Sequence, residues 1–199
     1  MSDASNDLVS ILQRTPNDPS IAERVSALEQ SHPADLSHDS ALLEGVWDLR
    51  WSSSSQPWLR QAPWLENLQV LDPAQKRGCN LLRLRGPFGA IGAISVQADL
   101  EVINEKRVEV RFRKGGWLGP SLPGIGQLKL LREVEQSFPA WLDITYLGQQ
   151  LRVCRSSADA ECCIRSQKLS SQPRMWRKAT SPWHPSSSTS ITSSVQARL

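Results

Sequence analysis

The chain has 199 residues, of which 39% are hydrophobic and 22% are charged, which is the range of ordinary globular proteins and enough for one buried core. No apolar run approaches the roughly 20 residues of a membrane-spanning helix, and the N-terminus lacks the features of a signal peptide and is too acidic for an organellar transit peptide. Residues 1–155 contain 17 Lys and Arg against 18 Asp and Glu, which argues against a nucleic-acid partner.

Residues 1–40 are predicted to form a helical segment. Two short helices are expected, one ending before Pro16 and one ending at the His32-Pro33 break. The apolar positions at helical spacing are Leu8, Ile11 and Leu12 in the first helix, and Ile21, Val25 and Leu28 in the second. Two interpretations of this amphipathic pattern stay open, namely packing on the body of the domain and docking of a partner.

Within residues 41–155 there are runs in which apolar residues recur at every second position, which is the period of β-strands. In residues 106–114, for example, Val108, Val110 and Phe112 face one way while charged residues face the other. About seven such runs occur, at residues 45–52, 78–86, 93–103, 106–114, 128–136, 140–147 and 149–155. Several short strands with close turn signals predict an antiparallel barrel or sandwich.

Two of the connecting loops are unusually apolar. The loop at residues 52–69 contains Trp58 and Trp64, and the loop at residues 114–127 contains Trp117. Loops normally run over the surface and are polar. These loops are expected either to fold back over the end of the barrel or to present aromatic groups to a ligand or a membrane.

No catalytic motif is found along the chain. It has neither a phosphate-binding loop nor a G-x-S-x-G nucleophile elbow, and its three histidines are scattered. The adjacent pair Cys162-Cys163 does not have zinc-site spacing, so we expect no metal, no cofactor and reduced cysteines in a cytosolic compartment. A hydrolase or isomerase would lack a nucleophile–base pair, so a binding barrel is favoured over an enzyme.

Two motifs resemble the PAP/fibrillin family, the plastid lipid-associated proteins of plants and cyanobacteria. The first, L-x-G-x-W-x-L-x-[YW]-[ST], is matched by Leu43, Gly45, Trp47, Leu49, Trp51 and Ser52. The second, D-x-T-Y-L-D-x-x-L-R-[IV]-x-R-G, is matched by Asp143, Thr145, Tyr146, Leu147, Leu151, Arg152, Val153 and Arg155, with Gly148 in place of its second Asp. Together they bracket residues 42–155, and the N-terminal helices also fit.

This resemblance implies a mainly β fold, a lipocalin-like antiparallel β-barrel preceded by N-terminal helices. It implies binding of hydrophobic molecules of the carotenoid, prenylquinone or fatty acid class, peripheral association with thylakoid membranes or lipid globules, and roles in photoprotection and in lipid or quinone metabolism. The absence of a transit peptide favours the cyanobacterial type in the cytoplasm, or a processed plastid protein. The alternative is a scaffold that binds no ligand and docks a membrane-associated enzyme of quinone or lipid metabolism.

Six residues are candidates for the ligand site. Trp47, Trp51, Trp117 and Tyr146 are predicted to be aromatic residues of the pocket or of the core. Asp143 and Arg152, which flank the turn at residues 147–149, are predicted to pair inside the barrel or at its rim. Such a pair would orient a polar ligand head or serve as a structural salt bridge.

The sequence after Arg155 departs from the family. The family continues G-x-x-G-x-x-[FV]-V-L, a final strand, whereas residues 156–199 contain 12 Ser, six basic residues against two acidic ones, and no strand alternation. We therefore expect three regions: helices at 1–40, the barrel at 41–155, and a disordered Ser-rich basic tail at 156–199. The tail is interpreted as a divergent or frame-shifted replacement of the last strand, or else as a basic extension that binds anionic lipid headgroups.

Overall fold

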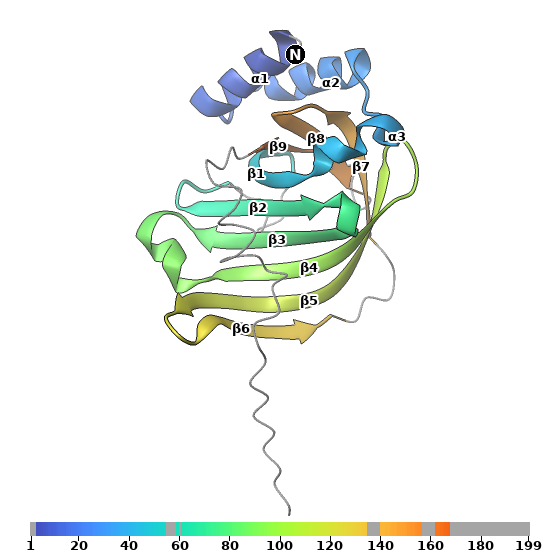
Figure 1. The fold of residues 1–199 in the computed structure, drawn as a ribbon. Helices are drawn as coiled ribbons and strands as arrows, with labels where there is room; N and C mark the ends of the chain where they lie inside the picture. The colour runs from blue at the N-terminus through green and yellow to red at the C-terminus, as the bar shows by residue number, and fades with distance from the viewer. Residues whose placement is uncertain (1–2, 55–58, 60, 135–139, 157–161, 168–199) are drawn as a thin grey trace, which may run out of the picture.

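The computed structural model describes residues 3–54, 59, 61–134, 140–156 and 162–167. It is mainly β and consists of a closed eight-stranded antiparallel barrel preceded by N-terminal helices (Figure 1). The predicted fold class, an antiparallel β-barrel preceded by helices, is therefore confirmed. The strands are β1 (Gly45–Ser52), β2 (Leu65–Asp72), β3 (Arg77–Leu84), β4 (Ala93–Val102), β5 (Arg107–Leu122), β6 (Gly126–Glu133), β7 (Ala140–Leu147), β8 (Leu151–Ser156) and β9 (Cys162–Gln167).

The ring of strands runs β4-β3-β2-β1-β9-β8-β7-β5 and closes through the pairing of β5 with β4. The long strand β5 closes the ring because it pairs with β4 along one edge, while β7 and β6 share its other edge. Residues Arg107 to Val110 pair with β7, whereas Lys114 to Leu122 pair with β6. Strand β6 therefore extends the sheet beyond the ring, at the lower edge of the molecule in Figure 1.

The helices α1 (Asp3–Arg14) and α2 (Ile21–Ser31) pack on the outside of the barrel, above β7–β9 in Figure 1. Each has a periodic apolar face, and these two faces are buried together with the outward side chains of the strands below. The buried residues of this first cluster are Leu8, Leu12, Ile21, Val25, Leu28, Tyr146, Leu151, Val153, Cys162 and Ile164. Of the two interpretations of the helices, packing on the domain is therefore confirmed.

A carboxylate adds a polar contact to this helix–barrel interface. Glu29 of α2 accepts hydrogen bonds from Arg155 Nη2 at 2.6 Å, Arg155 Nε at 3.0 Å and Thr145 Oγ1 at 2.6 Å. The chain then continues through α3 (Leu36–Asp39) and the 3-10 helix η1 (Ser40–Leu43) into β1. On the way Leu36 donates its backbone N–H to the Glu105 carbonyl, in the turn between β4 and β5.

Strand β9 corrects the expectation that no strand follows Arg155. It lies between β8 and β1, pairs with both in antiparallel register, and so completes the ring. The sequence of β9, Cys-Cys-Ile-Arg-Ser-Gln, lacks a run of β-branched or aromatic residues, so its strand conformation depends on the two neighbours that it pairs with. The rest of the predicted tail, residues 157–161 and 168–199, lies outside the described residues, and its disorder stays a prediction.

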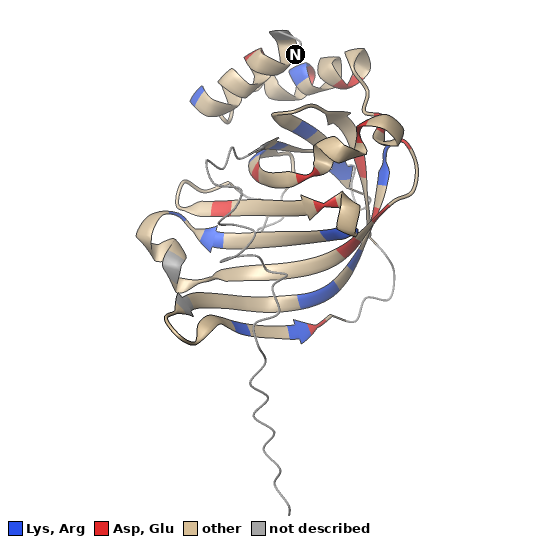
Figure 2. Ribbon diagram, viewed as in Figure 1, with Lys and Arg blue, Asp and Glu red and all other residues tan. Residues whose placement is uncertain are grey.

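Alternation along the strands separates the barrel interior from its outer face. On β4 the residues Val96, Ala98, Leu100 and Val102 point inward, while Gln97 and Asp99 between them do not line the interior cavity. The interior cluster contains Trp47, Leu49, Leu71, Val108, Ile144, Cys154 and Cys163. Basic and acidic residues are interspersed over helices and strands in Figure 2.

Candidate ligand-binding cavity

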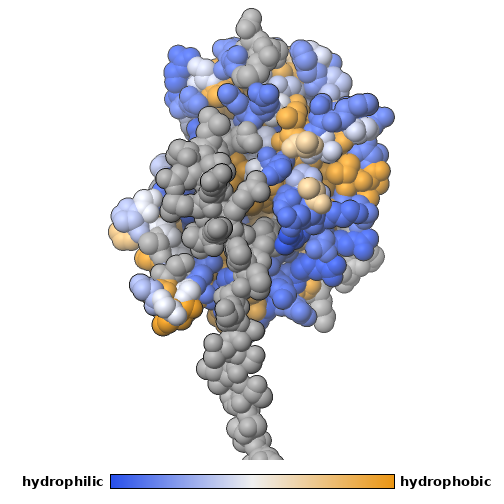
Figure 3. Space-filling view, viewed as in Figure 1, coloured by the Kyte–Doolittle hydropathy of each residue, from blue (hydrophilic) through white to orange (hydrophobic). Residues whose placement is uncertain are grey.

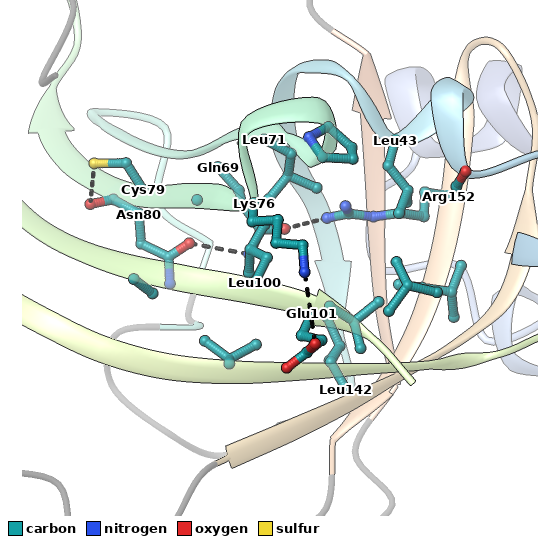
Figure 4. A pocket seen from close by; sticks show the side chains of 18 of the residues that line it. Leu43, Gln69, Leu71, Lys76, Cys79, Asn80, Leu100, Glu101, Leu142 and Arg152 are labelled. Carbon is teal, nitrogen blue, oxygen red and sulfur yellow. Dashed lines mark hydrogen bonds and ion pairs between the residues drawn. The ribbon is translucent and has the colours of Figure 1, made fainter. Parts of the chain in front are cut away.

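The barrel encloses a cavity of about 400 Å³. This volume falls within the range of roughly 300–1,000 Å³ that is typical of small-molecule sites. Its apolar wall consists of Leu43, Leu71, Val96, Ala98, Leu100, Val108, Val110, Phe112, Leu142 and Ile144. These residues come from η1, β2, β4, β5 and β7, so the wall is formed by segments far apart in the sequence (Figure 4).

The cavity reaches solvent near the 3-10 helix η3 (Pro73–Gln75), which joins β2 to β3. Lys76 and Glu101 line it there, and their exposed side chains form an ion pair with Nζ and Oε1 3.6 Å apart. Because both groups are exposed, this pair contributes little to stability. The Lys76–Glu101 pair marks a polar edge at the opening of the apolar cavity.

Arg152 is the one fully buried charged residue among the described side chains of the cavity wall. Its Nη2 donates to Gln69 Oε1, and Gln69 Nε2 in turn donates to Asn80 Oδ1 at 3.0 Å, so the amide of Gln69 is oriented by both partners (Figure 4). Its Nε and Nη1 have no hydrogen-bond partner among the described residues. Burial lowers the pKa of Arg152 to about 10, which leaves the guanidinium charged at neutral pH.

Trp47 supports this guanidinium. The Arg152 Cζ lies 4.9 Å from the centroid of the Trp47 ring, a cation–π contact, and Trp47 Nε1 donates to the Leu43 carbonyl at 2.9 Å. The Trp47 side chain is fully buried. The first family motif therefore places its tryptophan in the barrel core, directly against the arginine of the second motif.

A second buried arginine lies next to Arg152. Arg165 of β9 is directly opposite Arg152 in the β8–β9 register and is 5% exposed. It donates to the backbone carbonyl and to the Oδ1 of Asn67, at 3.1 and 3.2 Å. Burial lowers its pKa. Within the described part of the chain, neither arginine has a carboxylate within ion-pair distance.

Asp143 and Arg152 do not pair, contrary to one expectation from the sequence. Asp143 accepts from Arg107 Nε at 2.8 Å and Nη2 at 2.9 Å, and these hydrogen bonds hold its pKa below the usual range. The reason is a bulge between Ile144 and Tyr146 in the β7–β8 register. The extra residue shifts the alternation, so that Asp143 and Arg152 lie on opposite faces of the sheet.

The other predicted site residues are separated by the fold. Trp51 packs with the cluster beneath the helices, outside the barrel, and Tyr146 belongs to the same cluster. Trp117 lies on β5 away from the cavity and is 38% exposed. Arg152 thus lines the cavity, Trp47 contacts Arg152, and the remaining predicted aromatics lie elsewhere. The predicted role of each in ligand binding stays a prediction.

Sequence reasoning missed the polar residues Gln69 and Asn80 and the inward face of β4. A signal for β4 was present, because Val96, Ala98, Leu100 and Val102 alternate with polar residues. The stripe of Val108, Val110 and Phe112 was recognised as one face of a strand and does line the cavity. Polar and apolar residues are mixed along β2, so nothing in its local pattern distinguishes Gln69 from the other polar residues of the strand.

Exposed apolar residues gather beyond the cavity, where the 3-10 helix η4 (Gly86–Ile91) and the β5–β6 turn lie together at one end of the barrel (Figures 1 and 3). In the register of the sheet, Ile94 of β4 is opposite Trp117, and Trp117 is opposite Leu130 of β6. We call this end the apolar rim; its residues are Phe88, Ile91, Ile94, Trp117, Ile125 and Leu130. Trp64 is also exposed, whereas Trp58 lies outside the described residues.

The cysteines of the described chain are buried free thiols. Burial raises the pKa of Cys79 to about 11 and that of Cys162 to about 12, so both are protonated at neutral pH and are poor nucleophiles. Among the described residues no group of three or more His, Cys, Asp or Glu side chains has the arrangement of a metal site. The same part of the chain contains no helix that is long and apolar enough to cross a membrane.

Fold and cavity define the class: a small antiparallel β-barrel with a helical N-terminal layer and an apolar interior. The PAP_fibrillin family model matches residues 11–139, which is more than half of the chain, so the protein belongs to the PAP/fibrillin family. The matched region includes the first motif and ends just before the second. Comparison with curated proteins finds no match, and neither does comparison with solved structures.

Proposed function

We propose that this protein binds a hydrophobic small molecule in the barrel cavity. The main support for this proposal is the cavity itself, because its wall is mostly aliphatic with a few polar groups at defined places. Ligand sites commonly combine these two properties, since apolar contacts supply affinity and polar contacts fix orientation. Molecules of the carotenoid, prenylquinone or fatty acid class are the candidates, and the protein acts as a carrier rather than an enzyme.

The second part of the proposal is peripheral association with a lipid surface such as a thylakoid membrane or a lipid globule. The apolar rim supports it, because exposed apolar residues grouped at one end of a molecule favour an interface. Trp117 suits such a position, since an indole has an apolar body and one hydrogen-bond donor. Family membership supports roles in photoprotection and lipid or quinone metabolism, in a cyanobacterial cytoplasm or a plastid.

A binding experiment tests the cavity directly. The neutral fluorophore 1-aminoanthracene is titrated into the protein and then displaced with decylubiquinone, β-carotene or oleate. The Val110→Trp variant should fill the cavity and abolish binding, because Val110 lines it. Val134→Trp, which adds the same ring at a residue 40% exposed and away from the cavity wall, should bind as the wild type does. Equal binding by both variants would refute the proposed site.

A further inference from the structure

Arg152 presents an unmatched charge to the cavity. Its side chain is fully buried, and two of its nitrogens, Nε and Nη1, lack hydrogen-bond partners among the described residues. Buried polar atoms are nearly always hydrogen-bonded, and a buried charge is costly unless it is paired. An arginine stays protonated in such surroundings, so the cost cannot be avoided by releasing the proton.

The groups around Arg152 do not neutralise it. Its contacts within the described chain include the amide oxygen of Gln69, the face of Trp47 and the thiol of Cys154, and none of these is a carboxylate. The neighbouring Arg165 adds a second positive charge, and its own hydrogen bonds go to Asn67. The ion pair of Lys76 with Glu101 belongs to the exposed edge of the cavity, where both side chains are more than half exposed.

We propose that the cavity binds an amphipathic ligand with an apolar tail and an anionic head, and that Arg152 binds this head. The inference rests on the proposed function and narrows it to carboxylates or phosphates that carry an aliphatic chain. The head would accept hydrogen bonds from the free donors of Arg152, and the tail would lie along the aliphatic residues of β4, β5 and β7. Charge-assisted hydrogen bonds of this kind are stronger than those to a neutral alcohol.

Ligand pairs that differ only in the head test this on the unmodified protein. Dissociation constants are measured for oleate against oleyl alcohol and for dodecyl phosphate against dodecanol, by displacement of 1-aminoanthracene. At least one anion should bind about tenfold more tightly than its alcohol, and the tighter anion identifies the head as carboxylate or phosphate. Equal affinities within both pairs would overturn the inference while leaving the cavity as a site for neutral ligands. Binding of none of the four would also overturn the inference, and a protein that binds neither these ligands nor 1-aminoanthracene would overturn the proposed function as well.

Variants then assign the effect to Arg152. Arg152→Gln should lose the preference for the anion and retain the affinity for the alcohol, and Arg152→Lys should keep part of the preference. Arg107→Gln removes the same charge from the outer face, where Arg107 pairs with Asp143, and should behave as the wild type does. If Arg152→Gln does not fold, the Arg152→Lys variant and the comparison of anions with alcohols test whether Arg152 binds the anionic head. An unchanged preference in a folded Arg152→Gln protein would show that the arginine is only structural.

Discussion

Trp47 connects the first family motif to the cavity. Replacing it with Phe removes the hydrogen bond to the Leu43 carbonyl, weakens the contact with Arg152 and leaves space in a fully buried site. We expect Trp47→Phe to lower the free energy of unfolding by about 2–4 kcal/mol. Urea denaturation measures this. The control Trp64→Phe, at a side chain 66% exposed, should change stability by less than about 0.5 kcal/mol.

Glu29 should make the attachment of the helices pH-dependent. Burial raises its pKa, but the hydrogen bonds from Arg155 and Thr145 outweigh this and hold the pKa below its ordinary value of 4.5. A lowered folded-state pKa contributes stability above pH 4.5 that is lost as the pH falls through the folded pKa. Glu29→Gln should therefore cost about 1–2 kcal/mol at pH 7 and less below pH 4. Urea denaturation across this pH range checks the trend, and a constant difference would contradict it.

At the scale of the element, β9 determines whether the sheet forms a ring. Ile164 of β9 is fully buried between the barrel and the helices. Ile164→Ala should lower the free energy of unfolding by about 2–4 kcal/mol, through lost burial and a residual cavity. Ile103→Ala, at a side chain 51% exposed, is the matched control and should have a small effect. If the two variants were equally stable, residues 162–167 would not be a strand of this barrel.

The strands of the barrel differ in how well they could be predicted from the sequence. Strands whose apolar and polar residues alternate, such as β5 with Val108, Val110 and Phe112, were predictable together with their inward face. Strand β9 was not, because its pairing with β1 and β8 compensates for a weak local pattern. The separation of Asp143 from Arg152 was not predictable either. It depends on a one-residue bulge, and a one-residue change in register moves side chains to the other face.

The candidate site was predictable in part. The two motifs singled out Trp47 and Arg152, which the fold brings into contact. The same motifs contributed Tyr146, which is buried beneath the helices, and Trp51, which is partly buried against the same cluster. A pattern of apolar and aromatic residues cannot by itself distinguish burial inside a barrel from burial under a helical layer. That distinction required the packing of α1 and α2.

At the scale of the whole molecule, the cavity edge and the apolar rim lie at different parts of the barrel. The edge carries Lys76 and Glu101, near η3, whereas the rim carries Phe88 and Ile91 of η4. This separation means that surface binding and cavity binding can be tested independently. A variant of the rim should leave the binding of a small ligand unchanged.

The rim should determine affinity for a lipid surface. The double variant Phe88→Ser, Ile91→Ser removes two exposed apolar groups, whose burial in lipid is worth about 1.5–3 kcal/mol each. We expect at least about a tenfold loss of binding to phosphatidylcholine vesicles in a flotation assay. Ile103→Ser, in the turn between β4 and β5, is the control and should bind as the wild type does. Undiminished binding by the double variant would show that the apolar rim does not contact the lipid surface.

The most direct test of the central claim is to extract the native protein with organic solvent and identify the extract by mass spectrometry. We expect one apolar or amphipathic small molecule in near-stoichiometric amount from the wild type, and its absence from Val110→Trp, whose added ring occupies the cavity. An empty wild-type extract, together with no binding of added 1-aminoanthracene, would contradict a ligand-binding barrel.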